Sequence, residues 1–88
     1  MRSGMSARKA QQRITGHYIT QRDGGLRYDY EAAWSRDGSR FFWEAQVKRG
    51  GDLKGKPNGH LLKAPIYPEK AVRAVVEHSI EILAGVEK

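Results

Sequence analysis

Two neighbouring segments in the middle of the chain alternate between apolar and polar side chains. In residues 26–35 and 40–49 almost every second residue is apolar. A period of two places these residues on one face of an extended chain, so each segment predicts a half-buried β-strand. The linking residues, RDGS, contain Asp37-Gly38, a pair suited to a two-residue type I′ turn. That turn would place Trp34 opposite Phe41 and Glu31 opposite Glu44.

Further strands are expected on either side of this hairpin. One is predicted at about residues 13–21, joined by RDGG at residues 22–25. A three-residue loop with Gly25 in the left-handed conformation would pair Tyr18 with Tyr30, whereas a two-residue loop would turn Ile19 and His17 inward. We prefer the first. Residues 59–63 could form a short fourth strand, which Pro65 would stop.

The carboxyl-terminal part of the chain predicts one helix. Pro68 suits the first helical turn and Gly85 suits the carboxyl-terminal cap. Between them an apolar stripe recurs at helical spacing, widened by Ala71 and Ile82 to about half the circumference; it consists of Val72, Val75, Val76, Ser79, Ile80 and Leu83. We therefore expect an α+β domain, a three- to four-stranded antiparallel meander with one helix packed on one face.

Length and composition narrow the class of protein. The 88 residues suffice for one small domain, predicted at residues 13–88, after a disordered basic tail at residues 1–12. There is no cysteine, which excludes disulfides and thiolate zinc sites. No stretch approaches the roughly 20 apolar residues of a membrane span. We expect a cytoplasmic protein that does not bind membranes.

The segment GGDLKGKPNG, residues 50–59, superficially resembles a phosphate-binding loop. Gly50, Gly55 and Lys56 have the required spacing, but Pro57 stands where the motif needs Ser or Thr to hold magnesium. An antiparallel fold also lacks the necessary βαβ unit. The segment is interpreted as a flexible glycine-rich loop, and no cofactor is predicted.

Catalysis and metal binding find no support in the sequence. The spacing of His17, His60 and His78 matches no metal motif. The carboxylates Asp29, Glu31 and Glu44 are predicted on an open, solvated sheet face, where acid-base chemistry is disfavoured. We do not expect an enzyme.

The remaining signal is positive charge. The chain has 16 Lys and Arg against 10 Asp and Glu, a formal charge of +6, and such an excess favours polyanionic partners. Basic residues neutralise phosphates, and an exposed aromatic ring offers a surface for stacking bases. The predicted contact residues are Arg27, Arg40, Phe42, Lys48, Arg49, Lys54 and Lys56. The sequence therefore predicts a small nucleic-acid-binding module, with DNA or RNA and the strand state left open.

The alternative is a non-catalytic protein-interaction or homo-oligomerisation module. The helix is more apolar than one small sheet needs, so Ala71, Ile80 and Ile82 could bury against a second copy. In topology alone, the expected fold resembles the three-stranded DNA-reading domains of some integrases and plant transcription factors. It also resembles sheet-plus-helix coactivators that bind single strands. The resemblance implies nucleic-acid binding and assigns no residue.

Overall fold

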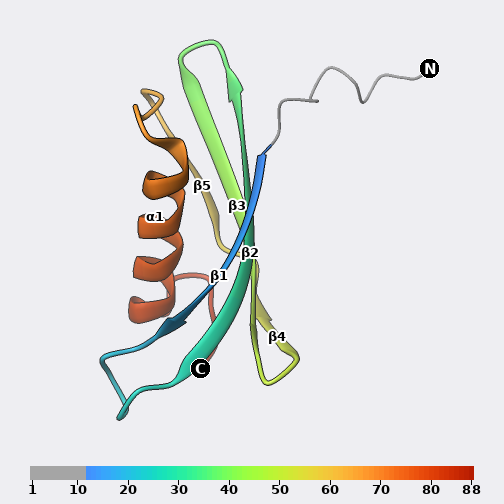
Figure 1. Cartoon of the computed structure of the whole chain (residues 1–88), viewed down its shortest axis with the longest axis vertical. Helices are drawn as coiled ribbons and strands as arrows, with labels where there is room; N and C mark the ends of the chain where they lie inside the picture. The colour runs from blue at the N-terminus through green and yellow to red at the C-terminus, as the bar shows by residue number, and fades with distance from the viewer. Residues whose placement is uncertain (1–11) are drawn as a thin grey trace, which may run out of the picture.

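The computed structural model describes residues 12–88, so the predicted tail, apart from Gln12, lies outside the described residues. Five strands precede one helix (Figure 1). The elements are β1 (Gln12–Ile19), β2 (Arg27–Asp37), β3 (Arg40–Arg49), β4 (Asp52–Gly55), β5 (Asn58–Leu61) and α1 (Pro68–Ile82).

All strand pairs are antiparallel and the strands follow the order β1, β2, β3, β4, with β5 pairing the other end of β3. Helix α1 lies across one face of this sheet, contacting β1, β2 and β3 (Figure 1). The α+β architecture predicted from the sequence is therefore confirmed. The opposite face of the sheet is not covered by any described helix.

The central hairpin has a different register from the predicted one. Asp37 pairs with Arg40, so the two turn residues are Gly38 and Ser39. Only Gly38, with a φ of 65°, has a positive φ, as in a type II′ turn with glycine first. Pairs shift by two positions, which leaves every side chain on its predicted face. Trp34 consequently faces Trp43.

The same shift removes the unfavourable carboxylate pair. Glu31 lies opposite Gln46, and Glu44 lies opposite Ala33. The predicted contact between Glu31 and Glu44 was wrong because the turn was placed one residue too early. Like charges directly opposite each other destabilise a sheet, so the observed register is the better one electrostatically.

The first hairpin is also shifted by two positions, because its connection is longer than predicted. Tyr18 pairs with Tyr28, and the backbone N–H of Thr20 donates to the Leu26 carbonyl at 2.9 Å. The loop is held by Arg22, whose guanidinium donates to the carbonyls of Ile80 and Glu81 at 2.8 Å. These bonds satisfy carbonyls at the end of α1 and place positive charge there, which the helix dipole favours.

The predicted flexible loop at residues 50–59 is instead a turn followed by an edge strand. Gly50 and Gly51 form the turn, with φ values of 60° and 90°. The edge strand, which we define as residues 52–61, comprises β4, a short irregular link and β5. Within the link, the Pro57 carbonyl accepts a hydrogen bond from Ala45 N–H at 2.9 Å, but proline has no N–H to return. The predicted fourth strand at residues 59–63 corresponds to β5 (Asn58–Leu61), whereas β4 was not predicted.

The carboxyl-terminal residues pack against this edge strand. Glu87 N–H donates to the Lys54 carbonyl at 2.7 Å, and Val86 forms a bridge with Gly55 and is almost fully buried. A Cβ atom at Gly55 would overlap the carbonyl oxygen of Gly85 and lie 2.9 Å from Val86 Cα. Gly55 is therefore explained by close backbone approach, not by phosphate binding.

The core lies between α1 and the inner sheet face, as the apolar stripe predicts. Its largest fully buried side chains are Tyr28, Phe41, Val47, Val72, Val76 and Ile80. The helix is capped by Leu83, before the predicted cap at Gly85. Leu83 adopts the left-handed conformation with a φ of 59°, and Ala84 N–H donates to the Ser79 carbonyl at 2.9 Å. Leu83 packs against the core, and this burial holds the strained cap in place.

A polar network ties α1 to the edge of β1. Tyr30 donates its hydroxyl hydrogen to Glu77 at 2.7 Å, while Arg73 donates to the Tyr30 hydroxyl at 3.2 Å and to the Thr15 carbonyl at 3.1 Å. A Cβ atom at Gly16 would lie 2.6 Å from the Arg73 guanidinium. The glycine in this strand therefore provides the space that the network occupies.

Candidate nucleic-acid interface

The face of the sheet turned away from α1, here called the outer face, is polar and charged. Strand pairing arranges its side chains in rows across the sheet. One row runs from Arg13 through Ala33 and Glu44 to Asn58, and the next includes Thr15, Glu31 and Gln46. The remaining members used below are His17, Arg27, Asp29, Arg40, Phe42, Lys48, Lys56 and His60.

Five of the seven predicted contact residues lie on the outer face. Arg27 is on β2, and Lys48 and Arg40 lie near opposite ends of β3 with Phe42. Lys56 lines a hollow of the outer face together with Arg13 and Asn58. The alternation of the strands therefore brings these residues to one surface.

Arg49 does not join them, and Lys54 lies at an irregular point of the edge strand. Arg49 lies on the α1 side of the sheet, where its guanidinium carbon is 6.0 Å from the ring centroid of the buried Tyr28. Lys54 is half buried at a β-bulge, and its carbonyl is bonded to the carboxyl-terminal segment. Residues 50–59 were predicted as a flexible loop, whereas most of this segment pairs with β3.

Positive charges on the outer face differ in their partners. Arg13 pairs with Glu31 and Arg27 with Asp29, each at 3.3 Å between exposed side chains. Exposed pairs of this kind contribute little to stability, roughly 0 to 1 kcal/mol, and exchange readily. Within residues 12–88, three further cations of this face, Arg40, Lys48 and Lys56, form no ion pair. These three are the side chains most available to an anionic ligand.

An aromatic pair lies near the Arg40 end of β3. Phe42 is 36% exposed, and its ring centroid is 6.2 Å from that of His60, the residue opposite it on β5. Phe42 was predicted from the sequence but His60 was missed, because residues 58–61 were not assigned a register. The alternation of β5, once paired to Phe42, would have placed the histidine on this face.

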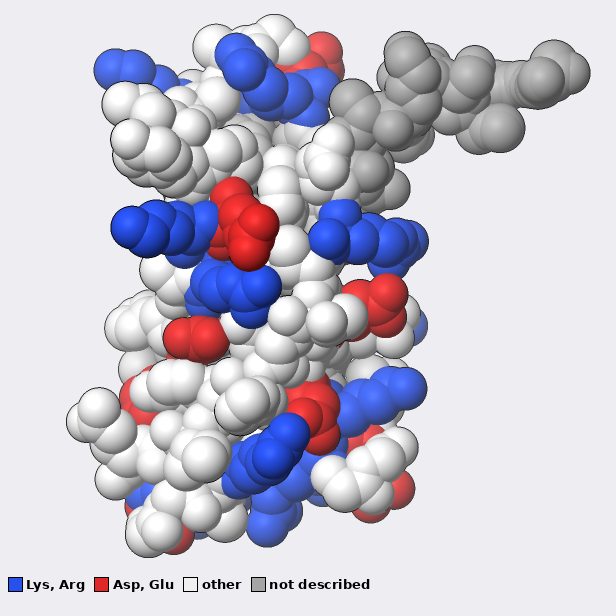
Figure 2. All heavy atoms as spheres, viewed as in Figure 1, with Lys and Arg blue, Asp and Glu red and all other residues white. Residues whose placement is uncertain are grey.

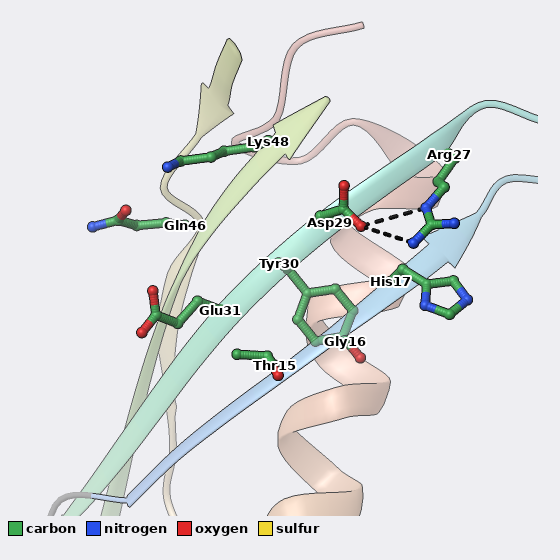
Figure 3. A pocket seen from close by; sticks show the side chains of 9 residues that line it. All are labelled: Thr15, Gly16, His17, Arg27, Asp29, Tyr30, Glu31, Gln46 and Lys48. Atoms are coloured by element: carbon green, nitrogen blue, oxygen red, sulfur yellow. Dashed lines mark hydrogen bonds and ion pairs between the residues drawn. The ribbon is translucent and has the colours of Figure 1, made fainter. Parts of the chain in front are cut away.

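Two shallow hollows lie side by side on the outer face. One, of about 450 Å³, includes His17, Arg27, Asp29 and Lys48 in its lining (Figure 3). The other, of about 380 Å³, is lined by Arg13, Glu44, Lys56 and Asn58, among others. Glu31 and Gln46 line both, so these two side chains lie between the hollows.

The carboxyl groups with shifted pKa values lie elsewhere. Hydrogen bonds from Gln21 N–H and the Tyr18 hydroxyl lower the pKa of Glu81, and ion pairs with Arg22 and Lys88 lower the pKa of Asp23. Both groups hold the first loop or the chain end against α1, which is a structural role.

In the region shown in Figure 2, positive and negative side chains are interspersed.

Two kinds of feature are absent from residues 12–88. No group of three or more His, Asp or Glu side chains in this range could hold a metal ion. None of the helices in the described part of the chain is long and apolar enough to cross a membrane.

No protein-family model, curated protein or solved structure matches the chain.

Proposed function

We propose that this protein is a small nucleic-acid-binding module that contacts its ligand through the outer face. The observation that carries the proposal is the placement of three cations without ion pairs, Arg40, Lys48 and Lys56, around a face that no described helix covers. The formal charge of +6 supports the same class of partner, because a basic surface attracts and steers polyanions.

Each type of side chain has a distinct role in this proposal. The three cations contact phosphates, and Arg13 and Arg27 join them by exchanging their carboxylate partners for phosphate oxygens. The partly exposed ring of Phe42, beside His60, provides an apolar surface for a base or sugar. Charge gives affinity that does not depend on sequence, and the remaining polar groups contact base edges.

Fluorescence anisotropy with labelled single-stranded and duplex oligonucleotides, across a salt series, tests the proposal. Affinity should fall steeply with salt, and a Lys48→Ala/Lys56→Ala double variant should reduce the slope of log K against log salt by about two. An Arg49→Ala/Lys70→Ala variant removes the same charge on the α1 side of the sheet and should leave the slope nearly unchanged. Absence of binding at low salt, or equal effects of the two variants, would refute the proposal.

Self-association is a second candidate function, and one of the three residues predicted for it is not available to a partner. Ile80 is fully buried in the core of its own chain and cannot contact a partner, whereas Ala71 is half buried and Ile82 is 56% exposed. The segment before α1 exposes more apolar surface: Leu62, Ile66 and Tyr67 are 78%, 86% and 69% exposed. Exposed apolar clusters are typical of interaction sites.

Sedimentation velocity distinguishes these surfaces. If the segment before α1 mediates self-association, Ile66→Ser/Tyr67→Ser should convert an oligomer to a monomer, while Ile82→Ser should not. A monomeric parent protein at all accessible concentrations would exclude self-association as its function.

A further inference from the structure

Strand β5 pairs with β3 on one side only, and its other side is a sheet edge within the described part of the chain. We infer that this edge pairs with the same edge of a second copy, so that two molecules join into one continuous sheet. The inference rests on self-association, the second candidate function, and assigns it to the edge of β5 rather than to the segment before α1.

The hydrogen-bond pattern of the ladder identifies the backbone groups at this edge. Ala45 N–H donates to the Pro57 carbonyl, so these two residues form a hydrogen-bonded pair. Hydrogen-bonded and non-hydrogen-bonded pairs alternate along an antiparallel ladder, which places Asn58 and His60 in non-hydrogen-bonded pairs with β3. The N–H and C=O groups of Asn58 and His60 therefore point away from β3. Within residues 12–88, they form no backbone hydrogen bond on that side.

The adjoining part of the same edge already accepts a strand-like segment. Gly55 pairs with β3 on one side and forms a bridge with Val86 on the other, where Glu87 N–H donates to the Lys54 carbonyl. The carboxyl-terminal segment thus extends the sheet beyond β4 and ends there, beside the uncovered β5. The remaining edge has room for one short antiparallel strand.

The absence of charge along this edge favours a second copy as the partner. Residues 57–62, PNGHLL, contain no Lys, Arg, Asp or Glu, although the chain has a formal charge of +6. In a two-fold contact a charged residue would lie near its own counterpart and be repelled, so two basic chains approach best along an uncharged stretch. Lysine is a common protection of sheet edges against pairing, and residues 58–62 contain none.

The expected register places His60 opposite its counterpart in the second copy. Asn58 then lies opposite Leu62 of the other chain once β5 extends by one residue on association. A register with His60 opposite Asn58 leaves Leu62 out and makes fewer hydrogen bonds. Leu62 is 78% exposed, and the preferred register covers part of this apolar side chain.

Pairing in this way joins the outer faces of the two copies. Opposite residues of an antiparallel pair project to the same side of a sheet, and His60 lies with Phe42 on the outer face. Lys56 and the ring of Phe42 in each copy then lie near the junction. The dimer would present a wider basic surface than a monomer and contact more phosphates of one nucleic acid.

Sedimentation velocity across protein and salt concentrations tests the inference. We expect a reversible dimer that salt strengthens, because salt screens the repulsion between two chains of formal charge +6, whereas it weakens nucleic-acid binding. His60→Pro should abolish the dimer because it removes an outward N–H, while His60→Ala removes the same ring, keeps the N–H and should retain the dimer. Leu62→Lys should weaken association by at least about tenfold through like charges across the contact. Ile66→Ser/Tyr67→Ser should leave it intact.

A single introduced thiol reports the contact directly, because the chain has no cysteine. Residues of a hydrogen-bonded antiparallel pair have Cα atoms about 5.5 Å apart, which suits a disulfide. His60→Cys should therefore form disulfide-linked dimers in a glutathione buffer. His17→Cys, at an exposed histidine on the edge strand β1, is the matched control and should stay largely monomeric.

Circular dichroism and a thermal melt establish that each variant is folded, and if His60→Pro unfolds, Leu62→Lys and the two cysteine variants decide. A monomer at every protein and salt concentration, a dimer that persists in the folded edge variants, or equal cross-linking of both cysteine variants would overturn the inference. A dimer that only Ile66→Ser/Tyr67→Ser dissociates would overturn it and leave self-association in place. Nucleic-acid binding is decided separately by the anisotropy experiment.

Discussion

Substitution of Gly55 by alanine provides a sensitive test of the fold at the carboxyl terminus. The three heavy atoms nearest to an added Cβ all belong to Gly85 and Val86. The chain can accommodate the methyl group only by straining this contact or by releasing the terminal segment. The loss of stability caused by Gly55→Ala therefore cannot exceed the free energy that holds the terminal segment against the edge strand.

That free energy can be worked from the contacts. Burial of Val86, which is 5% exposed, contributes about 1.5 to 3 kcal/mol. The hydrogen bond from Glu87 N–H to the Lys54 carbonyl adds about 1 kcal/mol. Replacing a strand glycine with alanine stabilises the folded protein by about 0.5 to 1 kcal/mol, because alanine reduces the entropy of the unfolded chain. We expect Gly55→Ala to destabilise the protein by about 1.5 to 3.5 kcal/mol.

Deletion of residues 85–88 should reverse the sign of this effect. Without Gly85 and Val86 the methyl group meets no obstacle among its nearest atoms, so Gly55→Ala should stabilise the shortened chain by about 0.5 to 1 kcal/mol. Urea unfolding followed by the fluorescence of Trp34 and Trp43 measures all four chains as a double-mutant cycle. An equal effect of Gly55→Ala in the full and shortened chains would refute the reasoning.

Two further predictions concern α1. Ile80→Ala should destabilise the protein by about 2 to 5 kcal/mol, because Ile80 is fully buried. Ile82→Ala, at an exposed position, should change stability by less than about 1 kcal/mol. If both substitutions lower the urea midpoint equally, the assignment of the helix faces is wrong. Because folding lowers the pKa of Glu81, its stabilising effect is present above the ordinary glutamate pKa and is lost as pH falls through the lower folded pKa. Glu81→Gln should therefore lower the urea midpoint at neutral pH and have little effect in strong acid, below the folded pKa. If Glu81→Gln changes the urea midpoint equally at both pH values, the carboxylate contributes no stability as an anion.

Side-chain alternation predicted the faces of the sheet more securely than its pairings. Both hairpins are displaced by two positions from the predicted registers, yet Tyr28, Tyr30 and Ala32 are buried as expected. A shift of two preserves the side of every residue, so the alternation alone cannot detect it. The displacement arises in the turns, where Gly38 and Arg22 determine the chain path.

Residues 50–59 show why the candidate site was predicted only in part. Glycine and proline there indicated a loop, because each weakens a strand by itself. In the structure Gly55 and Gly59 each have a tertiary reason that local sequence does not reveal. Gly55 accommodates the chain end, and Gly59 lies against the Trp43 indole, where an added Cβ atom would be 2.9 Å from the ring nitrogen. The resulting strand turns Lys56 toward the outer face, whereas Arg49 at the end of β3 lies on the α1 side.

The contact between Arg73 and β1 has a consequence for association between molecules. Strand β1 pairs only with β2 among the described strands, so its other side is an open sheet edge of the kind that recruits strands from other chains. Arg73 reaches from α1 to the Thr15 carbonyl at this edge, beside Gly16. A guanidinium on a backbone carbonyl occupies an acceptor that an incoming strand would need and brings a charge that the strand would have to displace. This contact from α1 therefore disfavours the addition of a strand from another chain at this point of β1.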